Sequence, residues 1–254
     1  MLLHEFICHL EEKHGCTAGC ALWDAKSGET LLSHREETVF KSASLIKTPI
    51  MLCALEDVEK GLISLETRIS VQPGQCVGDE APVIQNGTDV PLCVLLEYMI
   101  TESNNSATNV LIDMLGMDKV NVFSRRIGLE DTVLRRHMLD YEAARSGREN
   151  HTSAKDMRRL YTMLLTGEGL TPFMCETALP ILLRQKDKEL LMDANPAQKA
   201  AHKTGGLSDI AHDAGILFGE KRTLVFAVLA TAPDERQCVA LHQELSPHVM
   251  ALLG

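Results

Sequence analysis

At 254 residues and 45% hydrophobic composition, the chain is long enough to bury one large core or two packed lobes. Its formal net charge of -10 argues against nucleic acid and anionic membrane as partners, since both are bound through basic patches. We expect the longest basic cluster, Arg135-Arg136-His137, to be a solvated edge. No stretch approaches the length of a membrane span.

Residues 1–6 contain no basic segment followed by a long apolar run, so they do not resemble a secretory signal. We therefore expect a cytoplasmic protein, or a periplasmic or secreted one if a signal has been removed. The same reasoning predicts reduced thiols for all the cysteines, which are Cys8, Cys16, Cys20, Cys53, Cys76, Cys93, Cys175 and Cys238. No second Cys or His pair at ligand spacing accompanies Cys16 and Cys20, which favours buried structural thiols over a metal site.

The first elements are a helix over residues 2–14 and a hairpin with strands at Thr17–Asp24 and Glu29–Ser33. A second helix runs from about Leu45 to Lys60. Its first three turns are apolar nearly all round, which is typical of a helix buried in a core.

Helical signals dominate residues 61–185. The expected helices are Pro91–Thr101, Ser106–Leu115, Met117–Ile127, Ser153–Thr166 and Pro172–Leu183. Three strands are then expected at Lys199–Lys203, Ala214–Phe218 and Thr223–Ala230, with a turn at Gly205-Gly206, followed by a helix from about Asp234 to Leu252.

These elements predict an α/β fold of the α+β kind, in which a five-stranded antiparallel sheet is flanked by the terminal helices. The sheet lobe comprises residues 1–34 and 186–254. An all-α lobe, residues 35–185, is inserted between its two parts, and the two lobes form one domain.

The first chemical motif is Ser44-Leu45-Ile46-Lys47, at the start of the buried helix. Residues three apart share a helix face, so Lys47 can reach Ser44 and accept its proton if the amine is uncharged. Burial and a second nearby cation favour the uncharged form, and Lys203 can supply that cation. The alternative is that Ser44 only caps the helix.

Two further motifs follow in the chain. Ser103-Asn104-Asn105 lies between two helices, where short polar residues usually cap and turn. In Lys203-Thr204-Gly205-Gly206 the glycines allow close approach of a substrate backbone, while the lysine and threonine suit a carboxylate. His212-Asp213 is not expected to act as a dyad, because adjacent strand residues point to opposite faces.

These three motifs in this order resemble the serine β-lactamase and penicillin-binding protein superfamily, and most closely the class A β-lactamases. The resemblance covers nearly the whole chain. It implies that Ser44 is acylated and that Lys47 is the base for that step. It also implies that Ser103 passes the proton to the leaving nitrogen and that Asn105 holds the substrate's side-chain amide.

The resemblance further implies that Lys203 and Thr204 bind the substrate carboxylate beside Gly205. The backbone N–H groups of Ser44 and Gly206 would form the oxyanion hole. No metal or other cofactor is implied. The expected partner is a small carboxylate-bearing amide or ester, bound by a monomer.

Two positions depart from the family pattern. Asn104 replaces the aspartate of the second motif, which braces a turn. Met138 stands where class A enzymes carry the glutamate that activates the deacylating water, and Glu142 stands where they carry an asparagine. We therefore expect Glu142 to be the deacylation base, helped or replaced by Asp140; alternatively both are solvated loop carboxylates.

The first functional hypothesis is hydrolysis of β-lactam amides through an acyl-enzyme on Ser44. The second keeps the chemistry but takes another carboxylate-bearing substrate, as a cytosolic esterase or amidase. The third is a sensor or binding module that is acylated by penicillin and deacylates slowly. A peptidase like the penicillin-binding proteins ranks last, because its substrate lies beyond the membrane.

Overall fold

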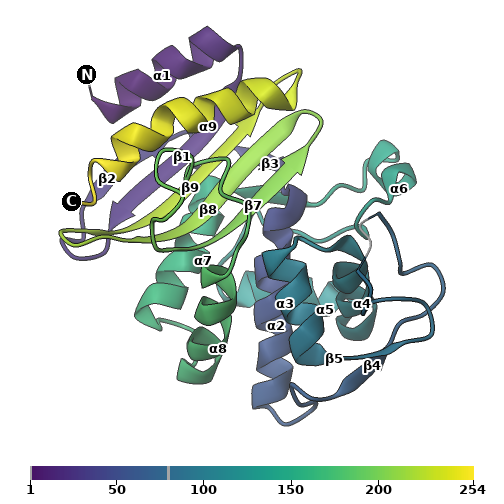
Figure 1. Ribbon diagram of the computed structural model, residues 1–254. Helices are drawn as coiled ribbons and strands as arrows, with labels where there is room; N and C mark the ends of the chain where they lie inside the picture. The colour runs from purple at the N-terminus through teal and green to yellow at the C-terminus, as the bar shows by residue number, and fades with distance from the viewer. Residues whose placement is uncertain (1, 79–80) are drawn as a thin grey trace.

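The computed structural model describes residues 2–78 and 81–254, which form an antiparallel five-stranded sheet with helices on both faces (Figure 1). The strand order is β2-β1-β9-β8-β7. The strands are β1 (Thr17–Asp24), β2 (Thr30–His34), β7 (Ala200–Leu207), β8 (Ile210–Phe218) and β9 (Thr223–Thr231). Helices α1 (Leu3–His14) and α9 (Glu235–Met250) cover one face, and α7 (Ala154–Thr166) and α8 (Pro172–Leu183) cover the other.

Strands β8 and β9 are buried along almost their whole length, because both faces of the sheet are covered. One apolar core lies between the sheet and the terminal helices, and includes Ile7, Phe226 and Leu241. A larger core joins the opposite face of the sheet to the helical part of the chain.

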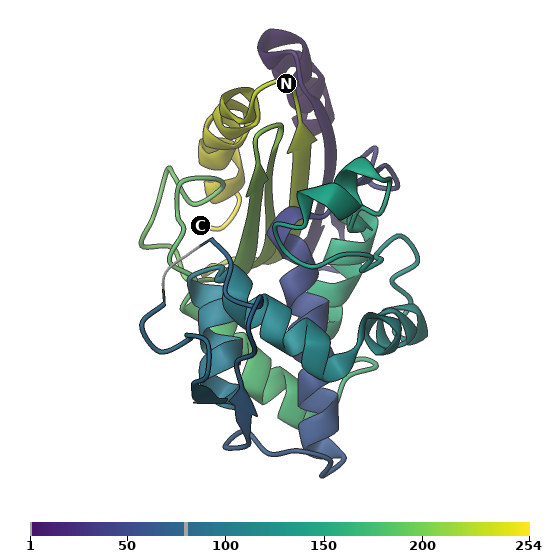
Figure 2. The same ribbon diagram turned by 90° about the vertical axis from the view of Figure 1, so that its right-hand side faces the viewer.

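The helical part surrounds α2 (Lys47–Glu59), which follows a 3-10 turn, η1 (Ala43–Ile46). Figure 2 shows α2 running from the sheet into the middle of the neighbouring helices. These neighbours are α3 (Leu92–Thr101), α4 (Asn105–Leu115) and α5 (Met117–Arg126). Every residue of α2 from Lys47 to Leu55 is buried, as its all-round apolar sequence predicts.

The fold class predicted from the sequence is confirmed, with the terminal helices and the five strands in their expected places. The segment 35–185 is not purely helical. It contains two short two-stranded sheets and a short helix. These are β3 (Val39–Lys41) paired with β6 (His151–Ser153), β4 (Arg68–Ser70) paired with β5 (Asp89–Pro91), and α6 (Tyr141–Arg145).

The third-motif strand is longer than predicted. Gly205 and Gly206 were expected to form a turn, but both lie within β7, paired with His212 and Ala211. The turn falls instead at residues 208–209, so β8 begins at Ile210 rather than at Ala214.

All eight cysteines are free thiols, as predicted. Within residues 2–78 and 81–254, no helix combines the length and apolar character needed to cross a membrane.

Candidate active site

The predicted nucleophile, Ser44, lies on η1, where the chain passes from the edge of the sheet into α2. Three of the four non-glycine residues with positive φ in the described chain flank this place: Ala43 at 44°, Ser103 at 53° and Leu139 at 61°. Left-handed backbone in residues with a side chain is strained, and such strain gathers where function fixes the geometry. Strained backbone thus occurs in the segments of two predicted site residues, Ser44 and Ser103.

The side chains of Lys47 and Lys203 converge on Ser103 from two different elements. Lys47 Nζ donates to Ser103 O over 2.5 Å, to Ser103 Oγ over 3.1 Å and to Asn105 Oδ1 over 2.9 Å. Lys203 Nζ, from β7, donates to Ser103 Oγ over 3.1 Å and to Thr204 O over 2.8 Å. Both lysines are fully buried, so the Ser103 hydroxyl lies between two enclosed amines.

Burial lowers the pKa of Lys203 to about 8, against the opposing influence of the Asp187 and Asp213 carboxylates. Lys203 is therefore a cation in neutral solution but loses its charge under mildly alkaline conditions. A cation at this edge of the sheet suits an anionic substrate group, and Thr204 beside it adds a hydroxyl.

Gly205 is required by the contact between β7 and η1. A Cβ at this position would lie 2.9 Å from Ser44 N and 3.1 Å from Ala43 Cβ. The strand therefore touches the backbone of the nucleophile turn. Gly206, the next residue, meets no backbone so closely: a Cβ there would lie 2.6 Å from Glu235 Oε1, the end of a side chain.

A small pocket of about 80 Å³ opens beside Ser44. Its walls include Asn105 from the second motif and Gly206 from the third, so the motifs that lie far apart in the sequence meet here. The remaining wall is formed by Ala43, Arg136, Met138, Leu139, Tyr141, Glu149, Asn150 and Leu207.

Met138 has a fixed backbone in this wall. Asn109 of α4 accepts from Met138 N over 2.8 Å through Oδ1 and donates to Met138 O over 3.3 Å through Nδ2. The Met138 side chain is 7% exposed. The residue predicted to stand in the place of the class A glutamate is thus an apolar side chain on a hydrogen-bonded backbone.

Glu142 does not reach the pocket, contrary to its predicted catalytic role. It is exposed on α6 and is not among the lining residues. Asp140 caps this helix by accepting from Ala143 N over 2.9 Å. Asp140 therefore stabilises the loop through its carboxylate.

The carboxylate that does line the pocket is Glu149, which the sequence analysis did not identify. Its Oε1 accepts from Arg136 Nε over 2.7 Å. Arg136 is 7% exposed, so the expectation of a solvated basic cluster is wrong at this residue. Its charge is enclosed because Glu149 neutralises it.

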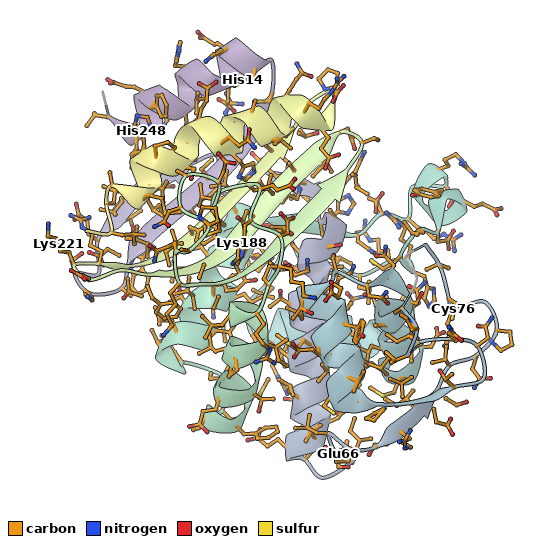
Figure 3. All side chains as sticks on the ribbon, viewed as in Figure 1. His14, Glu66, Cys76, Lys188, Lys221 and His248 are labelled. Carbon is orange, nitrogen blue, oxygen red and sulfur yellow. The ribbon has the colours of Figure 1, made fainter. Side chains whose placement is uncertain are left out.

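A buried chain of polar groups, also missed from the sequence, lies behind Lys203. Lys188 Nζ donates to His202 Nε2 over 3.0 Å, and His202 Nδ1 donates to Asp213 Oδ1 over 2.8 Å. Lys188 lies against the β7 side of the sheet (Figure 3). The His202 imidazole thus links Lys188 to Asp213, and only the tertiary fold brings residue 188 to residue 202.

His212 and Asp213 point to opposite faces of β8, as predicted. His212 Nε2 donates to Lys41 O over 2.9 Å, and its Nδ1 accepts from Ala230 N over 3.1 Å. Burial lowers the pKa of His212 to about 4, consistent with this neutral form. Its role is structural.

Asn104, the other departure from the family pattern, caps α4. Its Oδ1 accepts from Ala107 N over 2.8 Å. The residue is buried, and it braces the turn that carries Ser103 and Asn105.

A model of the β-lactamase enzyme family matches residues 2–252. The β-lactamase of Streptomyces lavendulae is 29% identical over 242 residues, which is 91% of this chain and 79% of that protein. The β-lactamase of Rhodobacter capsulatus is 31% identical over 174 residues, covering 67% of this chain and 59% of that protein.

Among solved structures, PBP-A superimposes with a TM-score of 0.85 at 25% identity, covering 98% of this chain and 97% of PBP-A. The β-lactamase from Sphaerobacter thermophilus DSM 20745 gives a TM-score of 0.84 at 26% identity, covering 98% and 95% of the two chains. A leucine-to-glutamate mutant of PBP-A, solved as an acyl-enzyme complex with penicillin G, is also similar, with a TM-score of 0.85 at 25% identity and the same coverage of 98% and 97%.

Proposed function

This chain belongs to the β-lactamase enzyme family and is a hydrolase of the serine β-lactamase type, and from that premise we propose that a β-lactam acylates Ser44. Water then hydrolyses the ester bond to Ser44, which releases the ring-opened product and restores the serine. The acyl-enzyme complex of the leucine-to-glutamate mutant of PBP-A with penicillin G supports the choice of a penicillin as the first substrate to test.

The observation that carries this proposal is the convergence of two buried lysines on Ser103 Oγ. A hydroxyl accepts two hydrogen bonds and still has one proton to donate. Ser103 can therefore give its proton to the nitrogen that leaves when the amide opens, and recover one from a lysine. Lys47, three residues from Ser44, is the group proposed to accept the serine proton. It does so in its uncharged form, which donates to only two of the three oxygens around Nζ and keeps a lone pair for the proton.

The substrate carboxylate is proposed to bind Lys203 and Thr204, while Asn105 receives the side-chain amide. The oxyanion is proposed to lie between the N–H groups of Ser44 and Gly206; the close approach of Gly205 to the Ser44 backbone supports this choice. This arrangement places negative charge beside the buried Lys203 cation.

A second candidate function is that of a sensor or binding module, in which penicillin acylates Ser44 and the ester is hydrolysed slowly. It is favoured by Met138, an apolar side chain, at the wall where class A enzymes carry the deacylating glutamate. The two functions share acylation at Ser44 and differ only in the rate of its hydrolysis.

Intact-mass spectrometry over time with benzylpenicillin, on wild type and Ser44→Ala, tests both. We expect an adduct in the wild type and none in the variant. Decay of the adduct with release of hydrolysed penicillin supports the hydrolase, and a lasting adduct supports the module. A third outcome would contradict both functions: benzylpenicillin forms no adduct and is not hydrolysed, while p-nitrophenyl esters are hydrolysed in a reaction that requires Ser44. The substrate would then be an ester and not a β-lactam.

A further inference from the structure

A second cluster of chemically active side chains lies where α1 meets β2. His4 and Cys8 are four residues apart on α1, and His34 ends β2. One possible metal-ligating atom from each of these residues lies within 4.8 Å of the other two. Strand β2 forms the edge of the sheet opposite to β7, so this cluster is separate from the candidate active site.

The two imidazoles face each other through the nitrogens that bind metals. His34 Nδ1 lies 3.2 Å from His4 Nδ1. Ligand nitrogens in a tetrahedral zinc site, with Zn–N near 2.0–2.1 Å, lie about 3.3 Å apart. The existing separation therefore matches that of two nitrogens on one ion, and the rings need only rotate so that both lone pairs converge on it.

The orientation of His34 is set by a buried carboxylate. His34 Nε2 donates to Glu11 Oε2 over 3.1 Å, which leaves the Nδ1 lone pair directed toward His4. Glu11 is 8% exposed, and its other oxygen accepts from Ala18 N over 2.7 Å. A carboxylate behind a histidine is the usual support of a metal ligand, since it fixes the tautomer and the ring.

Cys8 adds a sulfur to this pair. Its Sγ lies 3.9 Å from His4 Nε2, and the side chain is half-buried. This nitrogen is not the one that faces His34, so the thiol must rotate toward His4 Nδ1 for all three residues to share one ion. The four-residue spacing on α1 keeps Cys8 on the same helix face as His4. Two imidazoles and a thiolate are the ligands that zinc prefers among the biological divalent ions.

We propose that His4, Cys8 and His34 bind one zinc-class divalent cation, with the fourth position open to water because His4 is exposed. Binding releases the thiol proton of Cys8. The ion joins the first helix to the edge strand of the sheet, and its role is to hold α1 in place.

Titration of the metal-free full chain with Co²⁺ tests the site directly. A thiolate and imidazoles around Co²⁺ produce a near-ultraviolet charge-transfer band and intense visible bands, and Zn²⁺ should remove both by competition. We expect one equivalent to bind. Cys8→Ser should abolish the charge-transfer band, and His34→Gln should weaken binding at least about tenfold.

The matched controls are Cys93→Ser and His9→Gln, which change the same residue types on α3 and α1 outside the cluster. Both should keep the wild-type spectrum. Zn²⁺ should also raise the melting temperature of the wild type and not that of Cys8→Ser, because an ion that binds only the folded chain stabilises it. A Co²⁺ spectrum that survives in Cys8→Ser and His34→Gln, or no binding by the wild type, would overturn the proposal.

Discussion

Lys203 Nζ donates a hydrogen bond to Ser103 Oγ over 3.1 Å, which joins the cation of the third motif to the hydroxyl of the second. The lysine is fully buried at the sheet edge, and that burial lowers its pKa to about 8. The protonation of one side chain thus affects both the hydrogen bonding of Ser103 and the binding of the substrate carboxylate that we propose for Lys203.

Acylation should therefore fall as the pH rises through about 8, because uncharged Lys203 no longer attracts the substrate carboxylate. The measurement is the second-order rate constant of acylation by benzylpenicillin at increasing pH. Lys203→Arg is the control, since a guanidinium keeps its charge and should remove the fall. A wild-type rate that stays constant across this pH range contradicts the prediction.

The same pKa shift affects stability. The folded chain holds the Lys203 proton less tightly than the unfolded chain, whose lysine has its ordinary pKa of 10.5. The cost of burying the cation is therefore fully present below about pH 8, and it declines as the pH rises toward 10.5.

Asp213→Asn should move the alkaline fall in acylation to lower pH. The Asp213 carboxylate raises the pKa of Lys203, so its loss lowers that pKa further. The asparagine Oδ1 can still accept from His202 Nδ1, which preserves the local hydrogen bond. The pH profile is the readout, and the exposed Asp193→Asn is the control. If Asp213→Asn left the midpoint of the pH profile unchanged, the Asp213 carboxylate would not affect the pKa of Lys203.

Gly205→Ala and Gly206→Ala form a matched pair that tests the contact between β7 and η1. The first adds a methyl group 2.9 Å from Ser44 N, where backbone must move; the second meets only the end of the Glu235 side chain. We expect Gly205→Ala to cost about 1–3 kcal/mol of stability and Gly206→Ala much less. Urea denaturation measures both. An equal loss of unfolding free energy in the two variants would mean that the backbone contact at Gly205 is no more restrictive than the side-chain contact at Gly206.

The large elements could be predicted because each carries its own periodic pattern. The apolar α2 is buried as expected, and β1 spans Thr17–Asp24 as predicted. The glycines of β7 were misassigned as a turn, because the sequence alone does not show that η1 presses against that strand. Three-residue strands such as β3 carry too few residues for a pattern.

The candidate site likewise contains residues that the sequence predicts and residues that it does not. The motifs containing Ser44, Ser103 and Lys203 could be identified because their order is informative. The likeness to class A enzymes put Glu142 in the place of their asparagine and suggested a base, but its side chain is exposed on α6. Contacts between distant segments, such as Lys188 with His202, have no local signal. The four-residue spacing of His4 and Cys8 on a helix was a signal that the sequence analysis did not use.

Met138→Glu should accelerate loss of the acyl group by about 10²-fold, the usual scale of general-base catalysis. The backbone of residue 138 is held by Asn109, and its side chain lines the pocket beside Ser44, so a carboxylate there can activate a water. Burial would raise the pKa of this carboxylate toward the neutral range, as a base requires. Decay of the penicillin adduct by intact mass is the measurement, with Met138→Gln as the control of equal shape.

Glu142→Gln belongs in the same experiment and should leave the lifetime of the adduct unchanged, because Glu142 is exposed on α6 outside the pocket. A lifetime several-fold longer in Glu142→Gln, with Glu149→Gln having no effect, would mean that α6 moves on acylation and brings Glu142 to the ester. A longer lifetime in Glu149→Gln alone would instead assign the water to the carboxylate that Arg136 now holds.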